Sequence, residues 1–385
     1  MPFRENNLDL EKKENIGVGI DVTQRCQCRC PTCFYEERDA ENDINHELFR
    51  TIIDEAKENG FRELYFLGGE PTLHREIFDL IDYGSTGNFD PLILVTNGLR
   101  LSDEEFCRSI AERDVMVAVQ RHVIGNDIKA ERIQNVLMGV EGTLPIVNNA
   151  FQNVEEYFRP ERVAVQCCIT KPVVESGQIF EVFRYARDHG YEQVMECTKA
   201  GPAFRRGGRM DVSPEELFKV YRRFQVIDHE FFPKLIAKKL TPQAYGKVCH
   251  MPETGVHVLI NGDVVPCVGQ PYVLGNLKNE KLAGILKSKK RKFFQYPEER
   301  IEGHCKTCDY LTDCTGGCRG DAYYNTGCFN SSVLQCPEIA KKTDLSEEDF
   351  IPGSCSSCDM EYDETCNKKD IKKTLERYLG DRYES

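Results

Sequence analysis

Short apolar segments alternate with amphipathic segments along the first ~210 residues of the chain. The apolar segments have the length of β-strands, and the segments between them carry apolar residues at helical spacing. This alternation is typical of βα units arranged around a parallel sheet, which places the chain in the α/β class. Six units are too few to close an eight-stranded barrel. Their candidate strands are Ile16–Val22, Glu63–Leu67, Leu92–Thr96, Val115–Val119, Arg162–Ile169 and Gln193–Glu196.

The segment between the first two strands predicts a helix. Asn45 is a residue type that caps helix N-termini, and Gly60 is one that ends helices. The predicted buried stripe consists of Phe49, Ile52, Ile53 and Ala56.

Two capping boxes predict further helix starts. Ser102 is followed three residues later by Glu105, and Ser213 is followed three residues later by Glu216. The second signal is the stronger of the two because Pro214 occupies the first helical position.

The pattern changes near residue 249. Helical periodicity weakens, and Val256–Asn261 and Val264–Val265 flank a Gly-Asp turn that predicts a β-hairpin. More than half of the 19 cysteines lie from here onward. We therefore expect a small second domain that is held together by metal rather than by a large apolar core.

Composition excludes several classes of function. The 385 residues include 63 acidic and 50 basic side chains, a formal net charge of −13, so we expect no nucleic-acid partner. No run of ~18 apolar residues occurs, so we expect no membrane contact. The charged start of the chain is not a secretory signal, and we expect a cytoplasmic protein whose cysteines bind metal rather than form disulfides.

The first cysteine motif directly follows the first strand. Cys26, Cys30 and Cys33 form CxxxCxxC on a short loop. Three thiolates suit a 4Fe–4S cluster with one open iron, and they also suit a catalytic zinc site with one open position. The spacing alone leaves both alternatives open.

A glycine pair ends the second strand. Gly68 and Gly69 would let the backbone approach a ligand, and Glu70 would pair there with a cationic amine. Parallel α/β folds place their sites at this carboxyl edge of the sheet. The sequence Gly-Gly-Glu-Pro is by itself more often a turn, but its position one βα unit after the cysteine motif favours a site.

This combination resembles the radical SAM superfamily, whose hallmark is CxxxCxxC after the first strand and a GGE motif after the second, in a partial (β/α)6 barrel. The resemblance implies that Cys26, Cys30 and Cys33 hold a 4Fe–4S cluster whose open iron chelates S-adenosylmethionine (SAM). It also implies reductive cleavage of SAM to a 5′-deoxyadenosyl radical. The implied SAM contacts are Gly68, Gly69, Glu70, Asn97, Gln120 and Gln166.

One position departs from the family pattern. Thr32 stands before the third cysteine, where the family usually has an aromatic residue, so Phe34 or Tyr35 would supply the ring. Arg121 and His122 come just after the fourth strand and are candidates to face the substrate. A histidine at such a position more often has only a structural role. Cys28, Cys167, Cys168 and Cys197 are expected to have no role, the last three as small buried side chains.

The cysteine pattern after residue 249 is more specific. It comprises Cys249, Gly262-x4-Cys267, Cys305-x2-Cys308-x5-Cys314-x3-Cys318 and Cys336. Zinc ribbons are the alternative, because four thiolates in such loops also bind zinc. The pattern resembles the SPASM extension of radical SAM enzymes, which implies two auxiliary 4Fe–4S clusters: Cys249, Cys267 and Cys318 for the first, and Cys305, Cys308, Cys314 and Cys336 for the second.

The first auxiliary cluster has three cysteines in this pattern, so its fourth position is either open or closed by another residue. Cys328 and the tail residues Cys355, Cys358 and Cys366 are the spare candidates. The expected units are an N-terminal arm (1–14), a radical SAM partial barrel (15–210), a helical linker (211–248), a small cysteine-rich α+β SPASM domain (249–340) and a tail with an extra CxxC (341–385).

The resemblance implies an oxidoreductase that oxidatively modifies a ribosomally made peptide or protein. The alternative is oxidation of a small metabolite or cofactor precursor, and a non-enzymatic iron–sulfur electron carrier is less favoured. Two features bear on the prediction of a peptide or protein substrate. We expect no leader-recognition domain, because the segment before the barrel is short. Val268 follows the cysteine of G-x4-C where sulfatase-maturing relatives have Asp, so formation of formylglycine is not expected. A low-potential donor such as flavodoxin or ferredoxin and anaerobic conditions are also implied.

Overall fold

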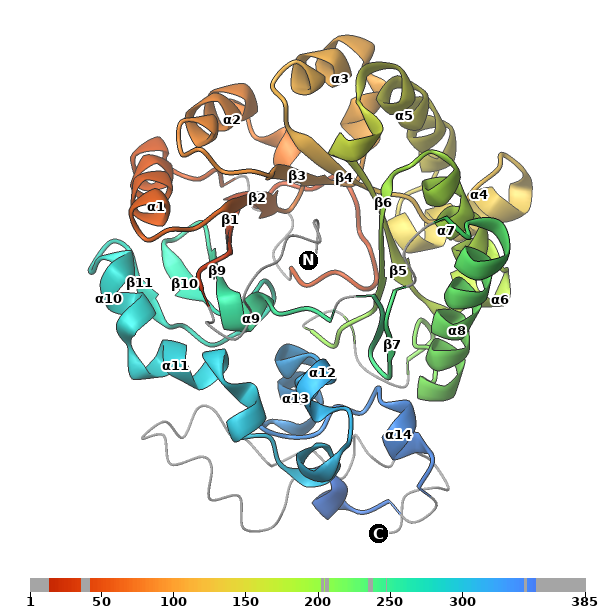
Figure 1. Cartoon of the computed structure of the whole chain (residues 1–385). Coiled ribbons are helices and arrows are strands. Elements are labelled where there is room, and N and C mark those ends of the chain that lie inside the picture. Colours follow the sequence, from red (N-terminus) through yellow and green to blue (C-terminus); the bar gives the residue numbers. More distant parts are fainter. Residues whose placement is uncertain are drawn as a thin grey trace.

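A nine-stranded sheet organises the chain, and six of its strands form the wall of a partial barrel (Figure 1). The computed structural model describes residues 14–35, 42–201, 204, 208–234, 238–246, 248–342 and 345–350. The barrel strands are parallel and adjacent in chain order, which confirms the six predicted strands. They are β1 (Gly17–Thr23), β2 (Glu63–Gly68), β3 (Leu92–Thr96), β4 (Met116–Gln120), β5 (Val163–Ile169) and β6 (Glu192–Cys197).

Helices cover the outer face of these strands (Figure 1). The apolar core lies between the two layers, because alternate strand residues such as Val18, Ile20 and Val117 are fully buried against the helices. The helices are α1 (His46–Glu58), α2 (Ile77–Ser85), α3 (Glu104–Ala111), α4 (Ile128–Met138), α5 (Thr143–Tyr157), α6 (Lys171–Glu175), α7 (Gln178–Asp188) and α8 (Pro214–Phe231), with short 3-10 turns η2 (Pro71–Leu73) and η3 (Leu99–Ser102).

Two of the three predicted helix starts are confirmed. The Asn45 side chain caps α1, whose buried residues are the four that the sequence indicated, and Ser213 and Glu216 form the capping box of α8. The prediction for Ser102 is wrong. Asp103 caps α3 by accepting from the backbone of Phe106, while the Ser102 hydroxyl donates to Leu99 O within η3. Asp and Ser cap helices about equally well, and Asp103 takes the cap because it directly precedes the first helical residue, Glu104.

The interior of the barrel changes character along its strands. A small apolar cluster that includes Met116, Ala118 and Ala164 fills the amino-terminal half. Gln120 and Gln166 follow on the same face of β4 and β5 and pair in register with each other. Polar interior positions therefore lie toward the carboxyl ends of the strands, where parallel sheets place their sites.

The chain after α8 forms a second, smaller group of elements. It begins with a two-stranded antiparallel pair, β7 (Leu240–Thr241) with β8 (Ala244–Tyr245). The remaining elements are α9 (Met251–Thr254), β9 (Gly255–Val258), β10 (Asp263–Val265), β11 (Gly275–Asn276), α10 (Leu282–Lys287), α11 (Lys289–Gln295), η5 (Pro297–Glu299), η6 (Gly303–Thr307), α12 (Leu311–Cys314), α13 (Arg319–Thr326), α14 (Pro337–Ala340) and η7 (Glu347–Asp349).

The hairpin β9–β10 is confirmed, and it joins the barrel sheet, which the sequence pattern did not indicate. β9 pairs in parallel with β1, so the hairpin continues the sheet beyond its first strand. Gly19 makes room for the pairing, since a Cβ there would lie 2.5 Å from His257 Nδ1. The His257 imidazole in turn lies 2.8 Å from the Asp21 carboxylate, and both side chains are buried.

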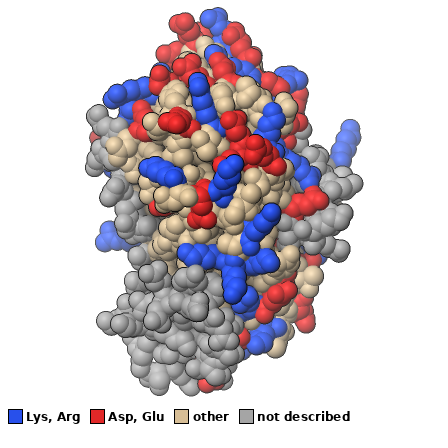
Figure 2. Space-filling model, turned by 90° about the vertical axis from the view of Figure 1, so that its left-hand side faces the viewer, with Lys and Arg blue, Asp and Glu red and all other residues tan. Residues whose placement is uncertain are grey.

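None of the helices in the described ranges is long and apolar enough to cross a membrane. Figure 2 looks onto the side where α1, α10 and α11 lie, and Lys and Arg side chains gather in the lower middle of this face. Exposed lysines of this region are Lys278, Lys281, Lys287, Lys289 and Lys292.

Candidate active site

The CxxxCxxC loop leaves the carboxyl end of β1. Cys26, Cys30 and Cys33 are partly buried, and Cys28 between them is almost fully buried. The Cys28 amide donates to Cys26 Sγ at 3.4 Å, and its thiol lies against those of Cys26 and Cys30, contacts that raise the pKa of Cys28. The structure therefore brings Cys28 into the group, although its position in the motif gave it no role.

The strand end of β2 holds one side of this loop. Gly69 N donates to Thr23 O at 2.8 Å and Glu70 N donates to Arg25 O at 2.7 Å. A Cβ at Gly68 would lie 2.3 Å from Thr23 O, and one at Gly69 would lie 2.3 Å from Arg25 O. The close approach of the two backbones requires glycine at both positions, whether or not these glycines also contact a ligand.

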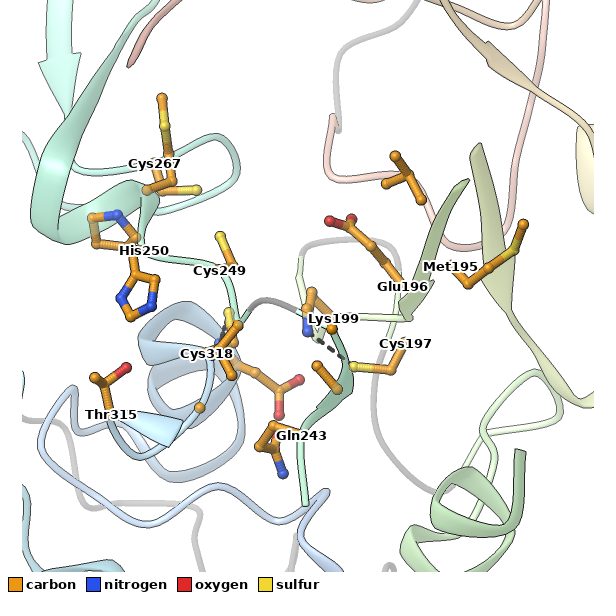
Figure 3. Close-up of a pocket in the computed structure, with 18 of the residues that line it drawn as sticks. Met195, Glu196, Cys197, Lys199, Gln243, Cys249, His250, Cys267, Thr315 and Cys318 are labelled. Atoms are coloured by element: carbon orange, nitrogen blue, oxygen red, sulfur yellow. Dashed lines mark hydrogen bonds between the residues drawn. The ribbon is translucent and has the colours of Figure 1, made fainter. Parts of the chain in front are cut away.

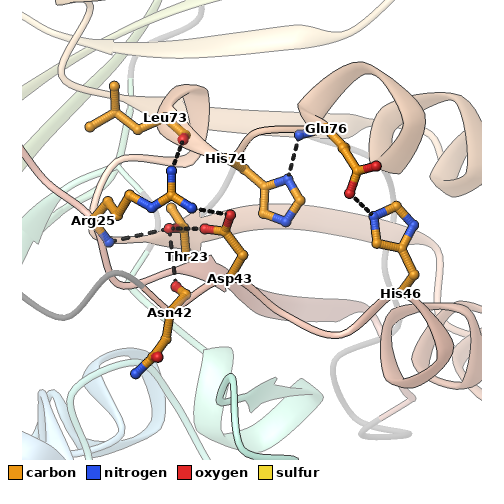
Figure 4. A network of polar contacts seen from close by, with 8 residues as sticks. All are labelled: Thr23, Arg25, Asn42, Asp43, His46, Leu73, His74 and Glu76. Atoms are coloured by element: carbon orange, nitrogen blue, oxygen red, sulfur yellow. Dashed lines mark hydrogen bonds and ion pairs between the residues drawn. The ribbon is translucent and has the colours of Figure 1, made fainter.

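A polar network fixes the start of the loop (Figure 4). Arg25 forms an ion pair with Asp43 and donates to Leu73 O at 3.4 Å. The Thr23 hydroxyl donates to the Asp43 carboxylate at 2.7 Å. In the middle of the loop, between Cys28 and Cys30, Arg29 N donates to Met138 O at 2.8 Å, so the loop is anchored at its start and at its centre.

Glu70 joins the ends of β2 and β3 below this loop. Its buried carboxylate accepts from the hydroxyls of Thr72 and Thr96, each at 2.6 Å, and from Asn97 N at 2.7 Å. Burial raises the pKa of Glu70, and the hydrogen bonds act against this rise. Oε2 accepts only the Asn97 bond among the described contacts, and a carboxylate oxygen accepts two, so one position suits an ammonium group.

Asn97 links Glu70 to the cysteine loop, because its side-chain amide lies 3.6 Å from Cys28 Sγ. The motif residues from β1, β2 and β3 are thus brought together. Gln120 and Gln166 lie on the interior face of β4 and β5, and no hydrogen bond joins their side chains to these residues within the described part of the chain.

The two residues after β4 differ in environment. The Arg121 guanidinium lies 4.2 Å from the Phe151 ring centre and 4.3 Å from that of Tyr185, within the helix layer. It therefore packs against α5 and α7 on the outer face of the sheet and does not point toward the barrel interior. His122 is fully buried with no hydrogen-bond partner among the described residues, and burial lowers its pKa to about 4, which keeps the ring neutral.

A cavity of about 810 Å³ lies between the carboxyl end of β6 and the C-terminal elements. Cys249, Cys267 and Cys318 line it from three separate segments (Figure 3). Desolvation in this setting raises the pKa of Cys267 and of Cys318. Three cysteines that line one cavity supply the thiolate donors that an iron–sulfur cluster takes.

Phe34 forms part of the cavity wall. Its ring packs against Gly201 and Gly269, where a Cβ would lie 3.0 and 2.6 Å away. The neighbouring Tyr35 points elsewhere, because its hydroxyl donates to Asp21 at 2.5 Å. Of the two rings that the sequence offered in place of Thr32, Phe34 is the one beside the cavity.

The four remaining SPASM-pattern cysteines form a second group around η6, α12 and the start of α14. Their thiols influence one another electrostatically, and burial raises the pKa of Cys314 and of Cys336 to about 12. The group consists of Cys305, Cys308, Cys314 and Cys336. Four cysteine thiolates are the donor set that a 4Fe–4S cluster takes, so this group fits a metal cluster.

The spare cysteines have different fates. Cys328 is buried but does not line the cavity, and its amide donates to Thr326 Oγ1 at 3.2 Å. Cys355, Cys358 and Cys366 lie outside the described residues. All 16 cysteines of the described ranges are free thiols.

Sequence reasoning missed one pair in the cavity. Cys197, interpreted as a small apolar side chain, accepts a hydrogen bond from Lys199 Nζ at 2.9 Å (Figure 3). The spacing of Cys197 and Lys199 across one residue at the end of β6 is the signal that was available. Cys167 fits the expectation, since it is fully buried in the core.

Comparison with known proteins gives two family matches. The radical SAM superfamily matches residues 20–133, and the SPASM iron–sulfur cluster-binding domain matches residues 249–309. These ranges include CxxxCxxC with the GGE motif, and Cys249 through Cys308, respectively.

Relatives and solved structures agree with these matches. The tungsten-containing aldehyde ferredoxin oxidoreductase cofactor-modifying protein of Pyrococcus furiosus is 25% identical over 83% of this chain and 96% of its own length. The PqqA peptide cyclase of Methylocella silvestris is 24% identical over 86% and 89%. The structure of anSMEcpe with AdoMet and a peptide superposes with a TM-score of 0.64 at 16% identity, covering 95% of this chain and 96% of that one.

The residues at the ends of β1 and β2 fit a SAM-binding cluster site. They are the three motif cysteines, the glycines that let the loop approach, and Glu70, whose Oε2 can accept one more hydrogen bond. The two cysteine groups beyond β8 fit auxiliary clusters. The chain therefore contains a radical SAM domain and a SPASM domain, and it is an enzyme that binds SAM and a 4Fe–4S cluster through the first and further iron–sulfur clusters through the second.

Proposed function

We propose that the enzyme oxidatively modifies a ribosomally made peptide or protein inside the cavity between the barrel and the SPASM domain. The observation that carries this proposal is the shared lining of the cavity. The end of β6 lines the cavity together with Cys249, Cys267 and Cys318. A substrate held there lies beside an auxiliary cluster, which suits removal of an electron after removal of a hydrogen atom.

The SAM-binding residues in this proposal are those indicated by the sequence. SAM and its cluster together supply, when bound, a 5′-deoxyadenosyl radical that removes a hydrogen atom from the substrate. Cys26, Cys30 and Cys33 hold the cluster, and Glu70 with Asn97 binds the amino-acid part of SAM. Further contacts come from Gly68, Gly69, Gln120 and Gln166. Apolar residues of the wall such as Phe34, Leu67 and Met195 exclude water.

The auxiliary sites are assigned to the cysteine groups that the structure brings together. Cys249, Cys267 and Cys318 bind the first auxiliary cluster, and the group around η6, α12 and α14 binds the second. The five units with boundaries at 14, 210, 248 and 340 remain our proposed division of the chain. We place the enzyme in the cytoplasm under anaerobic conditions, because such clusters are sensitive to oxygen.

Relatives support both substrate classes. The PqqA peptide cyclase and SuiB of Streptococcus suis, solved with the precursor peptide SuiA at a TM-score of 0.60, act on or bind peptides. The SuiB match has 18% identity and covers 81% of this chain and 74% of that one. The second candidate function, oxidation of a cofactor precursor, is favoured by the full-length similarity to the P. furiosus cofactor-modifying protein.

The first experiment tests the radical chemistry. Anaerobically reconstituted protein is incubated with SAM and dithionite, and 5′-deoxyadenosine is quantified by mass spectrometry. We expect product from the wild type and from Cys107→Ala, a matched control in the helix layer, and none from Cys30→Ala. Absence of 5′-deoxyadenosine in the wild type would refute the proposal.

A second experiment separates the two substrate classes. The enzyme is incubated with peptides encoded by short reading frames beside its gene, and with low-molecular-weight extract from which peptides have been removed. A peptide that loses two hydrogen masses in a SAM-dependent reaction supports the first candidate. SAM-dependent consumption of an extract component alone supports the second.

The exposed lysines of α10 and α11 suit an acidic electron donor of the flavodoxin or ferredoxin type. No ion-pair partner is seen for Lys287, Lys289 or Lys292 within the described part of the chain. We expect a triple charge reversal to slow flavodoxin-driven formation of 5′-deoxyadenosine about tenfold and to leave the dithionite-driven rate unchanged. Equal effects on both rates would exclude this docking surface.

A further inference from the structure

We propose that Lys199 sets the reduction potential of the first auxiliary cluster by placing its ammonium group in the cavity wall beside Cys318. Lys199 follows β6, and the part of its side chain that is not covered by protein faces the cavity. In Figure 3 it lies between Cys197 and Cys318. This inference rests on the assignment of Cys249, Cys267 and Cys318 to that cluster.

The position of the ammonium is fixed from two sides. Lys199 Nζ donates to Cys197 Sγ at 2.9 Å, which holds the end of the side chain. The next residue, Ala200, donates its backbone N–H to the Asp321 carboxylate at 2.7 Å. Asp321 belongs to α13, the helix that Cys318 caps, so one helix positions both the cluster ligand and the loop that carries Lys199.

The charges around the ammonium explain why the fold tolerates it. A buried ammonium is costly unless negative groups compensate for it. Burial lowers the pKa of Lys199, but interactions with neighbouring groups outweigh this effect and raise it overall; these groups include Glu196, a carboxylate that lines the same cavity. Lys199 and Cys318 line the same cavity and lie next to each other in Figure 3, so the ammonium charge acts on this cysteine.

A cation at this place has a defined effect on a bound cluster. The potential of an iron–sulfur cluster depends on net charge and on hydrogen bonds to its sulfurs. Reduction adds negative charge, which a nearby ammonium stabilises, and the effect is large where water is excluded. One of the three N–H donors of Lys199 is used by Cys197, which leaves donors for the cluster side. Lys199 is therefore expected to make the first auxiliary cluster a better electron acceptor.

The test is a potentiometric titration of the iron-loaded protein, followed by electron paramagnetic resonance, without SAM or substrate. The signal of the first auxiliary cluster is identified as the one missing from Cys318→Ala protein. We expect Lys199→Met to lower its midpoint so that the equilibrium constant for one-electron reduction falls at least about tenfold, about 59 mV. Lys199→Arg should retain most of the wild-type midpoint.

The matched control is Lys238→Met. Lys238 lines the same cavity but is paired with Glu192 at 3.6 Å, and its removal should leave all midpoints unchanged. If Lys199→Met does not bind its full iron, Lys199→Gln is titrated in its place. The proposal would be overturned if the variant without the charge, Lys199→Met or Lys199→Gln, kept the wild-type midpoint of the first auxiliary cluster. An equal shift of the midpoints of all clusters would overturn it as well. Because no turnover is measured, this outcome is distinct from a failure to form 5′-deoxyadenosine.

Discussion

The contact between the β2 strand end and the cysteine loop predicts a specific effect of Gly69→Ala. A Cβ at Gly69 would lie 2.3 Å from Arg25 O, whereas ordinary contacts begin near 3.4 Å, so the two segments must separate by about 3.4 − 2.3 = 1.1 Å. That movement strains the bonds from Gly69 N to Thr23 O and from Glu70 N to Arg25 O. Overpacking costs about 1–3 kcal/mol and a weakened hydrogen bond about 1 kcal/mol, so we expect a destabilisation of about 2–4 kcal/mol.

Two other glycines separate the steric effect of an added methyl group from the effect of backbone strain on stability. Gly142 has a positive φ of +71°, but no atom lies within 4 Å of the place that an added methyl group would take, so Gly142→Ala should cost only about 1–2 kcal/mol from backbone strain. Gly68 combines a φ of +130° with a Cβ position 2.3 Å from Thr23 O, so its alanine variant should show the largest loss.

The assay combines anaerobic denaturant unfolding with iron and sulfide analysis. Three 4Fe–4S clusters correspond to about 12 irons per chain, and displacement of the cysteine loop should reduce Gly69→Ala to about 8 irons. Gly142→Ala should retain about 12. Full iron content together with wild-type SAM binding in Gly69→Ala would refute the argument that this backbone contact holds the cluster loop.

Three further predictions concern other parts of the site. Cys318→Ala should lose about 4 irons, whereas Cys328→Ala should keep about 12, because Cys328 does not line the cavity; equal iron content would contradict the assignment. Glu70→Gln should weaken SAM binding about 10–100-fold, measured by equilibrium dialysis, since hydrogen bonds to a charged group contribute about 1.5–3 kcal/mol; unchanged affinity would exclude the ammonium contact. Burial holds the pKa of His122 at about 4, below its ordinary 6.5, so the unfolded chain binds more protons and stability falls as the pH drops below 6.5. His122→Phe should reduce the loss of unfolding free energy between pH 7 and pH 5 by about 2 kcal/mol, and parallel pH profiles would contradict this.

The local pattern of the sequence predicted most of the barrel. The six strands and the helix from His46 to Glu58 follow from periodicity and capping residues alone, which report directly on local structure. The failure at Ser102 has a local cause as well. Two capping residues stand side by side there, and the periodic pattern does not indicate which of Ser102 and Asp103 begins the helix.

Contacts between distant segments were beyond the reach of the pattern. The cysteine spacing indicated the donor sets, but it did not indicate that Lys199 would lie beside Cys318 or that Cys328 would lie away from the cavity. The bonds of Glu70 to Thr96 and Asn97 likewise depend on the register of β2 and β3. Such partners are decided by the packing of elements, which a single sequence shows only where a known motif specifies it.

The pairing of β9 with β1 has a consequence for dividing this protein. With residues 249 onward removed, the backbone groups of Gly17 to Ile20 that now face β9 would form an open edge. Such edges recruit strands from other molecules. A shortened protein that ends before β9 is thus expected to aggregate even if every barrel side chain keeps its place, and chimaeras between relatives should exchange β1 and β9 as a unit.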